Sequence, residues 1–194
     1  MAIFYDRVEE LRRIKEFLAR PGFGLLVVYG RRRVGKTALV LKATEGLRRL
    51  YLLAVGRGDL ARLKRAAAEV DRRARYVAED WEALLAFLAD KVDVVIIDEF
   101  PNLVESDKAA LSAIQAAVDN VLANTSTKLI LLGSSVSVMT SKVLSYKSPL
   151  YGRRTASLEV KPVPFLQYRH FFPDKPAREL VEIHGFAGAS PTTW

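Results

Sequence analysis

Short apolar runs alternate with helical patterns along this chain of 194 residues. The runs are continuously apolar, and this favours strands that are covered on both faces, as in a parallel sheet. Five of them stand out, at residues 25–29, 50–55, 92–97, 128–132 and 156–163. The pattern therefore predicts a parallel sheet of about five strands.

Apolar residues spaced three, four and seven apart predict amphipathic helices between these strands. The stripes consist of Val8, Leu11, Ile14 and Leu18; Leu60, Leu63, Ala67 and Val70; Trp81, Leu84, Leu85 and Leu88; and Leu111, Ile114, Val118, Val121 and Leu122. Strands and helices thus follow one another in turn. This order predicts a three-layer α/β fold.

Length and composition predict one domain with a small appendage. Half of the residues are apolar, which is enough for a substantial core. Most prolines gather near the end, so we expect a core at residues 1–163 and a tail, a partial lid subdomain with helical structure, at residues 164–194. No apolar run is long enough to cross a bilayer and the first residues lack a secretory pattern, so we expect a cytoplasmic protein without a membrane partner.

The scarcity of soft metal ligands excludes several kinds of chemistry. The chain has no cysteine and two histidines, which rules out disulfides, thiolate metal sites and cysteine nucleophiles and leaves little for a zinc site. A magnesium ion held by oxygen ligands stays open. Frequent arginine with scarce amides and no cysteine is compatible with a thermophilic source.

Positive charge is concentrated in the first part of the chain. Through Arg75 there are 19 basic and 8 acidic residues, whereas the remainder has 11 and 14. Such asymmetry can mark a face that binds a polyanion. For the basic stretch at residues 60–75 the favoured interpretation is a solvated helix surface, because its apolar stripe lies opposite the charges.

A phosphate-binding loop follows the first apolar run. Gly30, Gly35, Lys36 and Thr37 satisfy the pattern G-x-x-x-x-G-K-[ST] between a buried strand and a helix. Its glycines let successive amide hydrogens turn toward phosphate oxygens, while the lysine reaches the outer phosphates and the threonine hydroxyl ligates magnesium. The residues expected to bind nucleotide are Gly30, Arg31, Arg32, Arg33, Val34, Gly35, Lys36, Thr37 and Ala38.

The three arginines fill free positions of this loop pattern. The backbone does the binding there, so the side chains of Arg31, Arg32 and Arg33 are expected to point away from the ligand. They can contact a partner or nucleic acid, or they can simply be solvated, and the solvated or structural role is favoured.

Two carboxylates end the apolar run "VDVVIIDEF". Asp98 and Glu99 are expected at the carboxyl end of a strand beside the phosphate loop, where open α/β sheets bind ligands. Asp98 is predicted to hold magnesium through water, and Glu99 to orient and polarise the attacking water. Ser134, after the next strand, either senses the terminal phosphate or forms a turn.

Arg153 and Arg154 precede the fifth predicted strand. From there an arginine can reach transition-state charge on a nucleotide of its own or a neighbouring chain, and this interpretation is favoured. The alternative is an arginine held by a structural carboxylate.

The segments "FYDRVEEL", "GRRRVGKT", "VVIIDEF", "LLGSS" and "SPLYGRR", in that order, resemble the archaeal ATPase family of P-loop NTPases, which is related to the AAA+ and STAND ATPases. The resemblance implies ATP as the ligand, with Phe4 and Arg7 near the adenine. It also implies a helical lid and often a winged-helix module, announced by a Gly-Gly-x-Pro-like turn, of which this sequence has only the segment Gly188–Pro191.

We therefore expect a magnesium-dependent ATPase, with ATP and Mg²⁺ as cofactors, whose nucleotide state drives a conformational or assembly switch. Its partners would be a protein client or further copies of the chain. One alternative is a DNA-associated protein with a regulatory or inert ATP site. A small-molecule kinase is a weaker alternative, since neither a substrate-binding insertion nor an arginine-bearing lid is recognisable.

Overall fold

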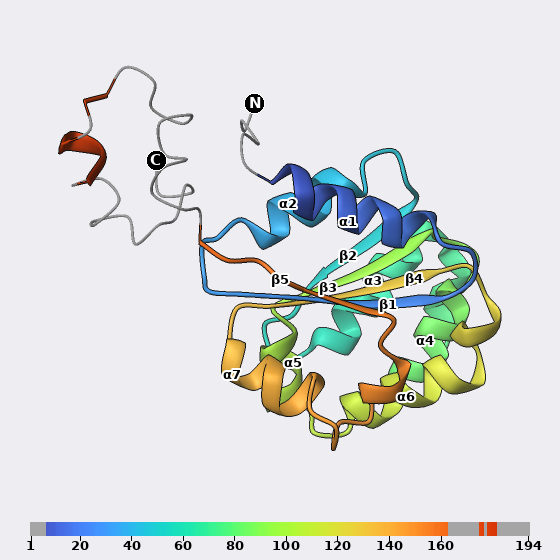
Figure 1. Ribbon diagram of the computed structural model, residues 1–194. Coiled ribbons are helices and arrows are strands. Elements are labelled where there is room, and N and C mark those ends of the chain that lie inside the picture. The colour runs from blue at the N-terminus through green and yellow to red at the C-terminus, as the bar shows by residue number, and fades with distance from the viewer. Residues whose placement is uncertain (1–6, 163–174, 177, 182–194) are drawn as a thin grey trace.

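The computed structural model describes residues 7–162, 175, 176 and 178–181, so most of the expected tail lies outside the described residues. Within them the predicted α/β fold is confirmed (Figure 1). The strands are β1 Gly24–Tyr29, β2 Arg49–Leu53, β3 Val94–Asp98, β4 Lys128–Gly133 and β5 Ala156–Glu159. The helices are α1 Val8–Ala19, α2 Lys36–Ala43, α3 Asp59–Val70, α4 Trp81–Leu88, α5 Phe100–Ser106, α6 Ala110–Asn120 and α7 Val136–Val138, with short turns η1 Arg72–Tyr76, η2 Leu122–Asn124, η3 Met139–Val143 and η4 Tyr151–Arg153.

All five strands form one parallel sheet in the order β2-β3-β4-β1-β5. Strand β4 therefore separates β1, which leads into the phosphate loop, from β3, which carries the carboxylates. The pattern alone had placed the carboxylate strand next to β1. The inserted strand adds its own carboxyl end to the same edge of the sheet.

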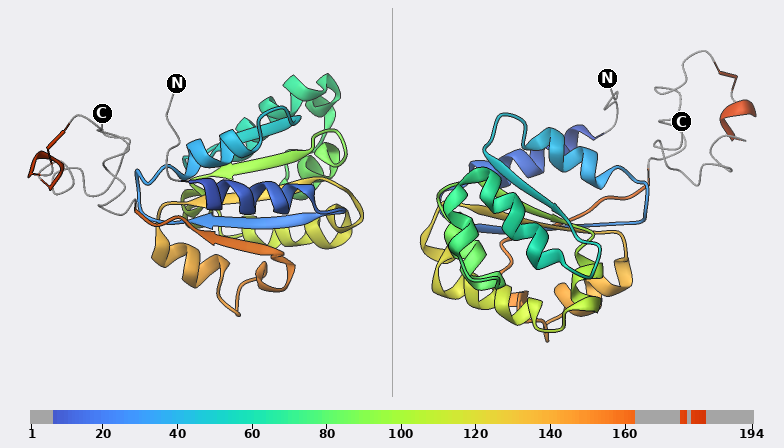
Figure 2. Two further views of the ribbon diagram at one scale, coloured as in Figure 1. Left: turned by 45° about the horizontal axis from the view of Figure 1, so that its top comes forward. Right: turned by 180° about the vertical axis from the view of Figure 1, so that it is seen from behind.

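Helices cover both faces of the sheet. Helices α1 and α2 lie on one face, while α4, α5, α6 and α7 lie on the other (Figures 1 and 2). Alternate residues of β1 follow these layers, because Leu26 and Val28 pack with α1 and α2, whereas Leu25 and Val27 pack with the other helices. The continuous apolar runs are explained by this two-sided burial.

Strand β2 departs from the expectation of a strand covered on both faces. It lies at the edge of the sheet and its residues are alternately exposed and buried. Leu50 and Leu52 enter the core, whereas Tyr51 and Leu53 are 36% and 45% exposed. An apolar run at an edge is thus only half buried, and the run alone does not reveal which strand is outermost.

Three predicted helical stripes extend beyond what the structure shows, because Val8 and Val70 are exposed on their helices and Val121 and Leu122 follow α6, which ends at Asn120. Val8, at the start of α1, is 72% exposed, since the buried stripe of that helix begins further along. Helix α3 ends at Val70, because Asp71 takes an extended conformation and its carboxylate accepts a hydrogen bond from the amide of Arg73, which lies in η1. Helix α5, which follows the carboxylates, was not predicted.

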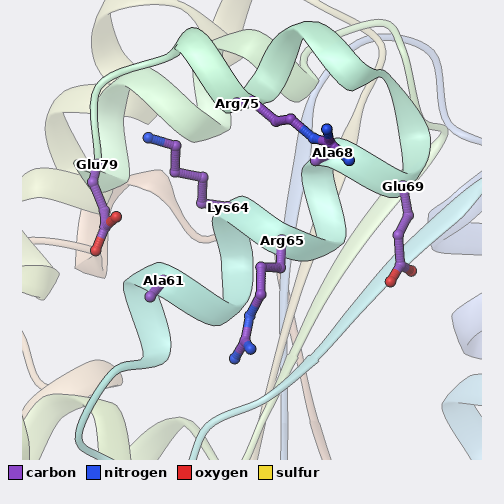
Figure 3. Close-up of a pocket in the computed structure, with 7 residues that line it drawn as sticks. All are labelled: Ala61, Lys64, Arg65, Ala68, Glu69, Arg75 and Glu79. Atoms are coloured by element: carbon purple, nitrogen blue, oxygen red, sulfur yellow. The ribbon is translucent and has the colours of Figure 1, made fainter.

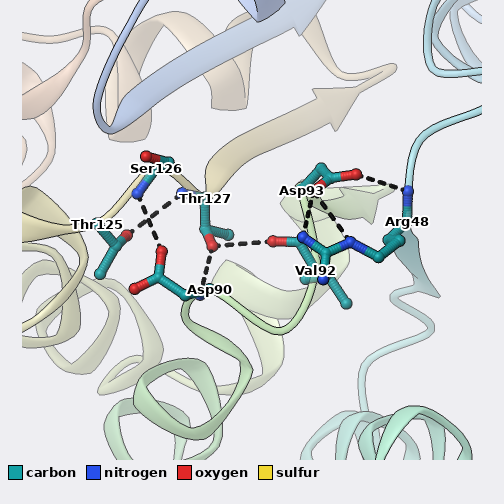
Figure 4. A network of polar contacts seen from close by, with 7 residues as sticks. All are labelled: Arg48, Asp90, Val92, Asp93, Thr125, Ser126 and Thr127. Carbon is teal, nitrogen blue, oxygen red and sulfur yellow. Dashed lines mark hydrogen bonds and ion pairs between the residues drawn. The ribbon is translucent and has the colours of Figure 1, made fainter.

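Polar side chains fix the turns at the amino edge of the sheet (Figure 4). The hydroxyl of Thr127 donates to the carbonyl of Val92 at 2.9 Å and accepts from the amide of Asp90 at 2.9 Å. Asp93 accepts from the amide of Arg48 at 2.9 Å and pairs with its guanidinium at 2.6 Å. These contacts tie the strand starts together.

No helix among the described residues is long and apolar enough to cross a membrane.

Candidate functional site

The predicted phosphate loop joins β1 to α2 at the carboxyl edge of the sheet. Gly30 has φ 153° and Gly35 has φ 88°, conformations that glycine adopts readily. A side chain at Gly30 would place its Cβ 2.2 Å from the carbonyl oxygen of Val160, so this position has no room for one. The loop is therefore packed closely against the segment after β5.

Lys36 points back into the loop. Its ammonium donates to the carbonyl oxygens of Gly30 at 2.9 Å and Arg31 at 2.8 Å, and the residue is 6% exposed. Burial lowers the pKa of this ammonium, although the nearby carboxylates of Glu99 and Asp98 act in the opposite direction. A phosphate placed in the loop would offer the ammonium a charged partner in place of two carbonyls.

Thr37 and Asp98 lie together, as the sequence predicts for a magnesium site. The Thr37 hydroxyl donates to Oδ2 of Asp98 at 2.6 Å, across a separation of 61 residues. Asp98 is 3% exposed, and its Oδ1 accepts from the amide of Glu99 at 2.8 Å. The carboxylate is thus fixed in an orientation that faces the phosphate loop.

Tyr51 is a member of this site that sequence reasoning missed. Its hydroxyl donates to the same Oδ2 of Asp98 at 2.8 Å. Burial raises the pKa of Tyr51, and the hydrogen bond to Asp98 adds to the rise. The residue stands within an apolar run, and only the pairing of β2 with β3 brings it beside Asp98.

Glu99 and Ser134 are also brought together. The Ser134 hydroxyl donates to Oε2 of Glu99 at 2.6 Å, because β4 lies next to β3 and both side chains follow their strands. Glu99 has φ 50°, a left-handed conformation that costs a non-glycine residue roughly 1–3 kcal/mol. Such backbone strain is most often found at functional sites.

Arg7 contacts the phosphate loop directly. Its guanidinium donates to the carbonyl oxygens of Val34 at 3.1 Å and Lys161 at 2.7 Å, and pairs with Glu10 at 2.7 Å. The adenine contact implied for Arg7 stays a prediction, and Phe4 lies outside the described residues.

The other loop residues divide into exposed and buried side chains. Arg31, Arg32, Arg33 and Ala38 are exposed, whereas Val34 is 2% exposed and packs in the core beneath the loop. Arg33 has φ 64°, so the loop contains a third residue with positive φ. The outward direction expected for the three arginines agrees with this exposure.

Arg153 and Arg154 are not brought to the phosphate loop of their own chain. Arg153 pairs with Asp119 of α6 through two hydrogen bonds, of 2.8 and 2.7 Å. Both arginines precede β5, and the amide of Thr155 bonds to the carbonyl of Leu25 at the start of β1. The loop lies about 13 Å further along that strand. Within its own chain, Arg153 is therefore an arginine held by a structural carboxylate, which was the alternative interpretation. A role of Arg153 toward the nucleotide of a neighbouring chain stays a prediction.

The oxygen atoms of this site fit magnesium better than a soft metal. Among the residues that the structure describes, no three histidine, cysteine or acidic side chains form a metal-binding group. The Thr37 hydroxyl and the Asp98 carboxylate are hard ligands, and Mg²⁺ is usually bound by one or two protein oxygens with water and phosphate completing its shell.

A separate hollow of about 680 Å³ lies outside this site, on α3 and η1 (Figure 3). It is lined by Ala61, Lys64, Arg65, Ala68, Glu69, Arg75 and Glu79. Lys64, Arg65 and Arg75 form no ion pair among the described residues, in contrast to Arg62, which pairs with Asp59 at 3.0 Å. The basic helix surface that the sequence predicts is thus concave, and these three charged side chains on it form no ion pair among the described residues.

Comparison with protein families gives a match over nearly the whole chain. The model of a family described as an ATPase domain predominantly from Archaea matches residues 4–193. A protein of Methanocaldococcus jannaschii, described as uncharacterized, is 51% identical over 189 residues. The alignment covers 97% of this chain and 43% of that protein, so the chain spans less than half the length of this relative.

Several solved structures share the fold. The Walker-type ATPase PABY2304 of Pyrococcus abyssi has a TM-score of 0.67 at 22% identity, covering 94% of this chain and 63% of that one. The ORC2 protein of Aeropyrum pernix, in ADPNP–ADP complexes, has a TM-score of 0.69 at 17% identity, covering 92% and 53%. Drosophila ORC bound to DNA has a TM-score of 0.66 at 13% identity, covering 87% and 46%.

Proposed function

The chain belongs to the family of ATPase domains found predominantly in Archaea, and from this premise we propose that it binds ATP with Mg²⁺ and hydrolyses it. The observation that carries the proposal is the 2.6 Å contact between Thr37 and Asp98, which joins the phosphate loop to the carboxylate strand. The ADPNP–ADP complexes of the Aeropyrum protein of similar fold support a nucleotide as the ligand.

Each polar group of the site has a role in this proposal. The loop amides and Lys36 bind the phosphates, and α2 begins at the loop with the positive end of its dipole. Thr37 and Asp98 would hold the magnesium ion. Bound magnesium supplies positive charge that stabilises the transferring phosphoryl group.

Glu99 and Ser134 prepare the attacking water. Glu99 orients and polarises it, and the Ser134 hydroxyl, now 2.6 Å from the carboxylate, holds the glutamate and senses the terminal phosphate. Positioning and electrostatics supply the acceleration, and no covalent intermediate on the protein is involved.

Nucleotide binding also changes the contacts of the loop. A phosphate draws Lys36 away from the carbonyls of Gly30 and Arg31, and these lie beside the segment that follows β5. We propose that this change drives a conformational or assembly switch that acts on a protein client or a second copy. The molecular mass in solution, compared with ATP and with ADP, tests the assembly switch.

The test of the function is nucleotide binding and phosphate release by two variants with matched controls. Lys36→Ala should lose at least about a hundredfold in ATP affinity, because a charge-assisted contact to phosphate is removed. Lys15→Ala, an exposed lysine of α1, should bind as the wild type does. Glu99→Gln should keep ATP binding and lose hydrolysis, whereas Glu105→Gln, exposed on α5, should hydrolyse normally.

Undiminished ATP binding by Lys36→Ala would show that the loop is not the nucleotide site. Normal hydrolysis by Glu99→Gln would remove the role of that glutamate. Phosphate release is measured without an added acceptor, since release to water separates an ATPase from a small-molecule kinase.

Nucleic-acid binding is a second candidate function, favoured by the concave basic surface on α3 and η1. Lys64, Arg65 and Arg75 line this hollow and form no ion pair among the described residues, and their charged ends point in different directions (Figure 3). The similar fold of Drosophila ORC, solved bound to DNA, supports the same candidate. Glu69 and Glu79 at the rim reduce the net positive charge of the hollow.

Duplex DNA affinity measured over a range of salt concentrations tests this candidate. Replacing Lys64, Arg65 and Arg75 by alanine should weaken DNA binding. It should also reduce the slope of log affinity against log salt concentration by about 0.9 for each DNA phosphate contact that is lost. The paired change Arg31→Ala and Arg32→Ala tests the loop arginines in the same assay. No binding at moderate salt would reject the candidate.

A further inference from the structure

The carbonyl of Val34 points away from the side of the loop that binds phosphate in the proposed function, and it is held there by Arg7. Arg7, 9% exposed, donates to this carbonyl at 3.1 Å and to that of Lys161 at 2.7 Å through the same nitrogen. No backbone amide in the described part of the chain donates to the Val34 oxygen. Arg7 is therefore the group that fixes this end of the Val34–Gly35 peptide.

A trans peptide points its carbonyl and its amide hydrogen in opposite directions. Because the Val34 carbonyl is directed at Arg7, the Gly35 amide hydrogen is directed to the other side, where the loop binds phosphate in the proposed function. Phosphate-binding loops need inward amides at such positions. A reversed peptide would present a carbonyl oxygen to the phosphate and repel it.

This peptide is free to reverse unless something holds it. A reversal turns φ of Gly35 by about half a turn from its value of 88°, and glycine adopts both signs of φ with similar ease. A Cβ at Gly35 would meet no atom within 4 Å beyond its chain neighbours and its own helix, so the surroundings of this glycine are open. The next peptide is secured separately, since the Gly35 carbonyl accepts from the amide of Leu39 at 2.9 Å.

Arg7 is itself held in place on both sides. Glu10, one turn further along α1, pairs with its second terminal nitrogen at 2.7 Å. Lys161, just after β5, accepts from the nitrogen that also reaches Val34. The guanidinium thus connects helix α1, the phosphate loop and the end of the sheet, and its planar fork suits this arrangement better than a lysine would.

We propose that Arg7 is a positioning residue that selects the phosphate-binding orientation of the Val34–Gly35 peptide. This inference rests on the proposed nucleotide function of the loop. It assigns Arg7 to the phosphate loop and not to the base, and so it differs from the adenine contact that the family resemblance implies.

The first experiment needs no ligand and uses the full chain. In ¹⁵N-labelled wild-type protein, Gly35 should give one amide resonance. Arg7→Met should shift it, split it or broaden it as the peptide samples both orientations. Arg12→Met is the matched control, because Arg12 on the same helix pairs with the exposed Glu9 and Glu16 and does not contact the loop. An unchanged Gly35 resonance in Arg7→Met overturns the proposal, whether or not the protein binds ATP.

The second experiment separates phosphate from base. Arg7→Met should lose about tenfold or more in affinity for ATP and for tripolyphosphate, with adenosine affinity unchanged, and Arg7→Lys should recover part of the loss. A loss for adenosine as large as that for ATP would assign Arg7 to the base and overturn the proposal. Arg7→Gln replaces Arg7→Met if the latter does not fold. Wild-type protein that binds neither ATP nor tripolyphosphate would instead refute the proposed function.

Discussion

Both edges of the sheet carry hydrogen-bonded polar side chains, but the two sets of bonds differ in kind. At the amino edge, Thr127 bonds to backbone groups of Val92 and Asp90, which are parts of turns (Figure 4). At the carboxyl edge, Thr37 bonds to the side chain of Asp98, and Ser134 bonds to that of Glu99. The hydroxyl of the amino edge thus completes the backbone, whereas the hydroxyls of the carboxyl edge join side chains. The amino edge also has a side-chain pair, Asp93 with Arg48, which is largely exposed.

This difference suits the proposed roles of the two edges, structural at the amino edge and ligand-binding at the carboxyl edge. A buried backbone group that loses its partner is costly, so the contacts of the amino edge have to persist. A hydroxyl bonded to a carboxylate can exchange it for a metal or a water, because both are natural partners of these groups. A high density of polar residues therefore does not identify the site, and the partners of the hydroxyl groups are more informative.

The largest effect on stability is expected from Thr127→Val at the amino edge. Valine has nearly the same shape but lacks the hydroxyl, so the amide of Asp90 loses its acceptor in a position where Thr127 is 2% exposed. The free energy of unfolding should fall by about 1–3 kcal/mol. Urea denaturation measures it, and ATP affinity measured alongside should stay unchanged.

The same substitution at the carboxyl edge, Thr37→Val, should affect the ligand more than the fold. ATP affinity measured with magnesium should fall about tenfold, or about 1.4 kcal/mol, because a predicted metal ligand is removed. Affinity in the presence of a chelator should hardly change. The proposed difference between the two edges would be contradicted if Thr37→Val lowered stability as much as Thr127→Val does. It would also be contradicted if Thr127→Val weakened ATP binding.

A smaller effect is expected from Arg153→Ala. The pair of Arg153 with Asp119 is about one-third exposed on each side, and solvent-exposed ion pairs contribute little to stability. The free energy of unfolding should therefore change less than in Thr127→Val, and the ATP affinity of the single chain should be unchanged. Hydrolysis is measured over a range of protein concentrations. A loss of hydrolysis confined to high concentrations would support a role of Arg153 toward a neighbouring chain.

The place of Arg153 in its own chain follows from a rule that can be applied to the sequence. A residue that precedes a parallel strand lies at the amino edge, and a residue that follows one lies at the carboxyl edge. Gly30, Asp98 and Ser134 all end or follow their strands, and the structure brings them to one edge as predicted. The same rule, applied to Arg153, places it at the opposite edge of its own chain.

The order of the strands in the sheet, in contrast, could not be predicted from the sequence. The apolar runs predicted the number of strands and their parallel direction, but residues 50–55 gave no sign of lying at an edge. Tyr51 was therefore not recognised as a partner of Asp98, since the contact exists only because β2 pairs with β3 in register. The role of Arg7 was similarly hidden, because its contact with Lys161 spans 154 residues.

The smallest expected difference between the two edges is in how the stability that their side chains contribute depends on pH. Arg48 lowers the pKa of Asp93 at the amino edge, chiefly through its hydrogen bond, whereas burial raises the pKa of Tyr51 at the carboxyl edge. The stabilising contribution of Asp93 should be present above its ordinary pKa of about 3.9 and be lost as the pH falls below it. That of Tyr51 should be present below about pH 10 and be lost as the pH rises further.

Two titrations check these signs. Arg48→Ala should raise the pKa of the Asp93 carboxyl, followed by NMR, because the guanidinium is removed while the amide of residue 48 still donates to Asp93. The tyrosinate absorbance of Tyr51 is obtained by subtracting the absorbance of Tyr51→Phe from that of the wild type. It should appear only above the pH at which ordinary tyrosines ionise, because burial and Asp98 both disfavour the phenolate. A difference signal centred near pH 10 would mean that Tyr51 is not held against Asp98 in solution, and the carboxyl edge would then lose one of the side-chain pairs that distinguish it from the amino edge.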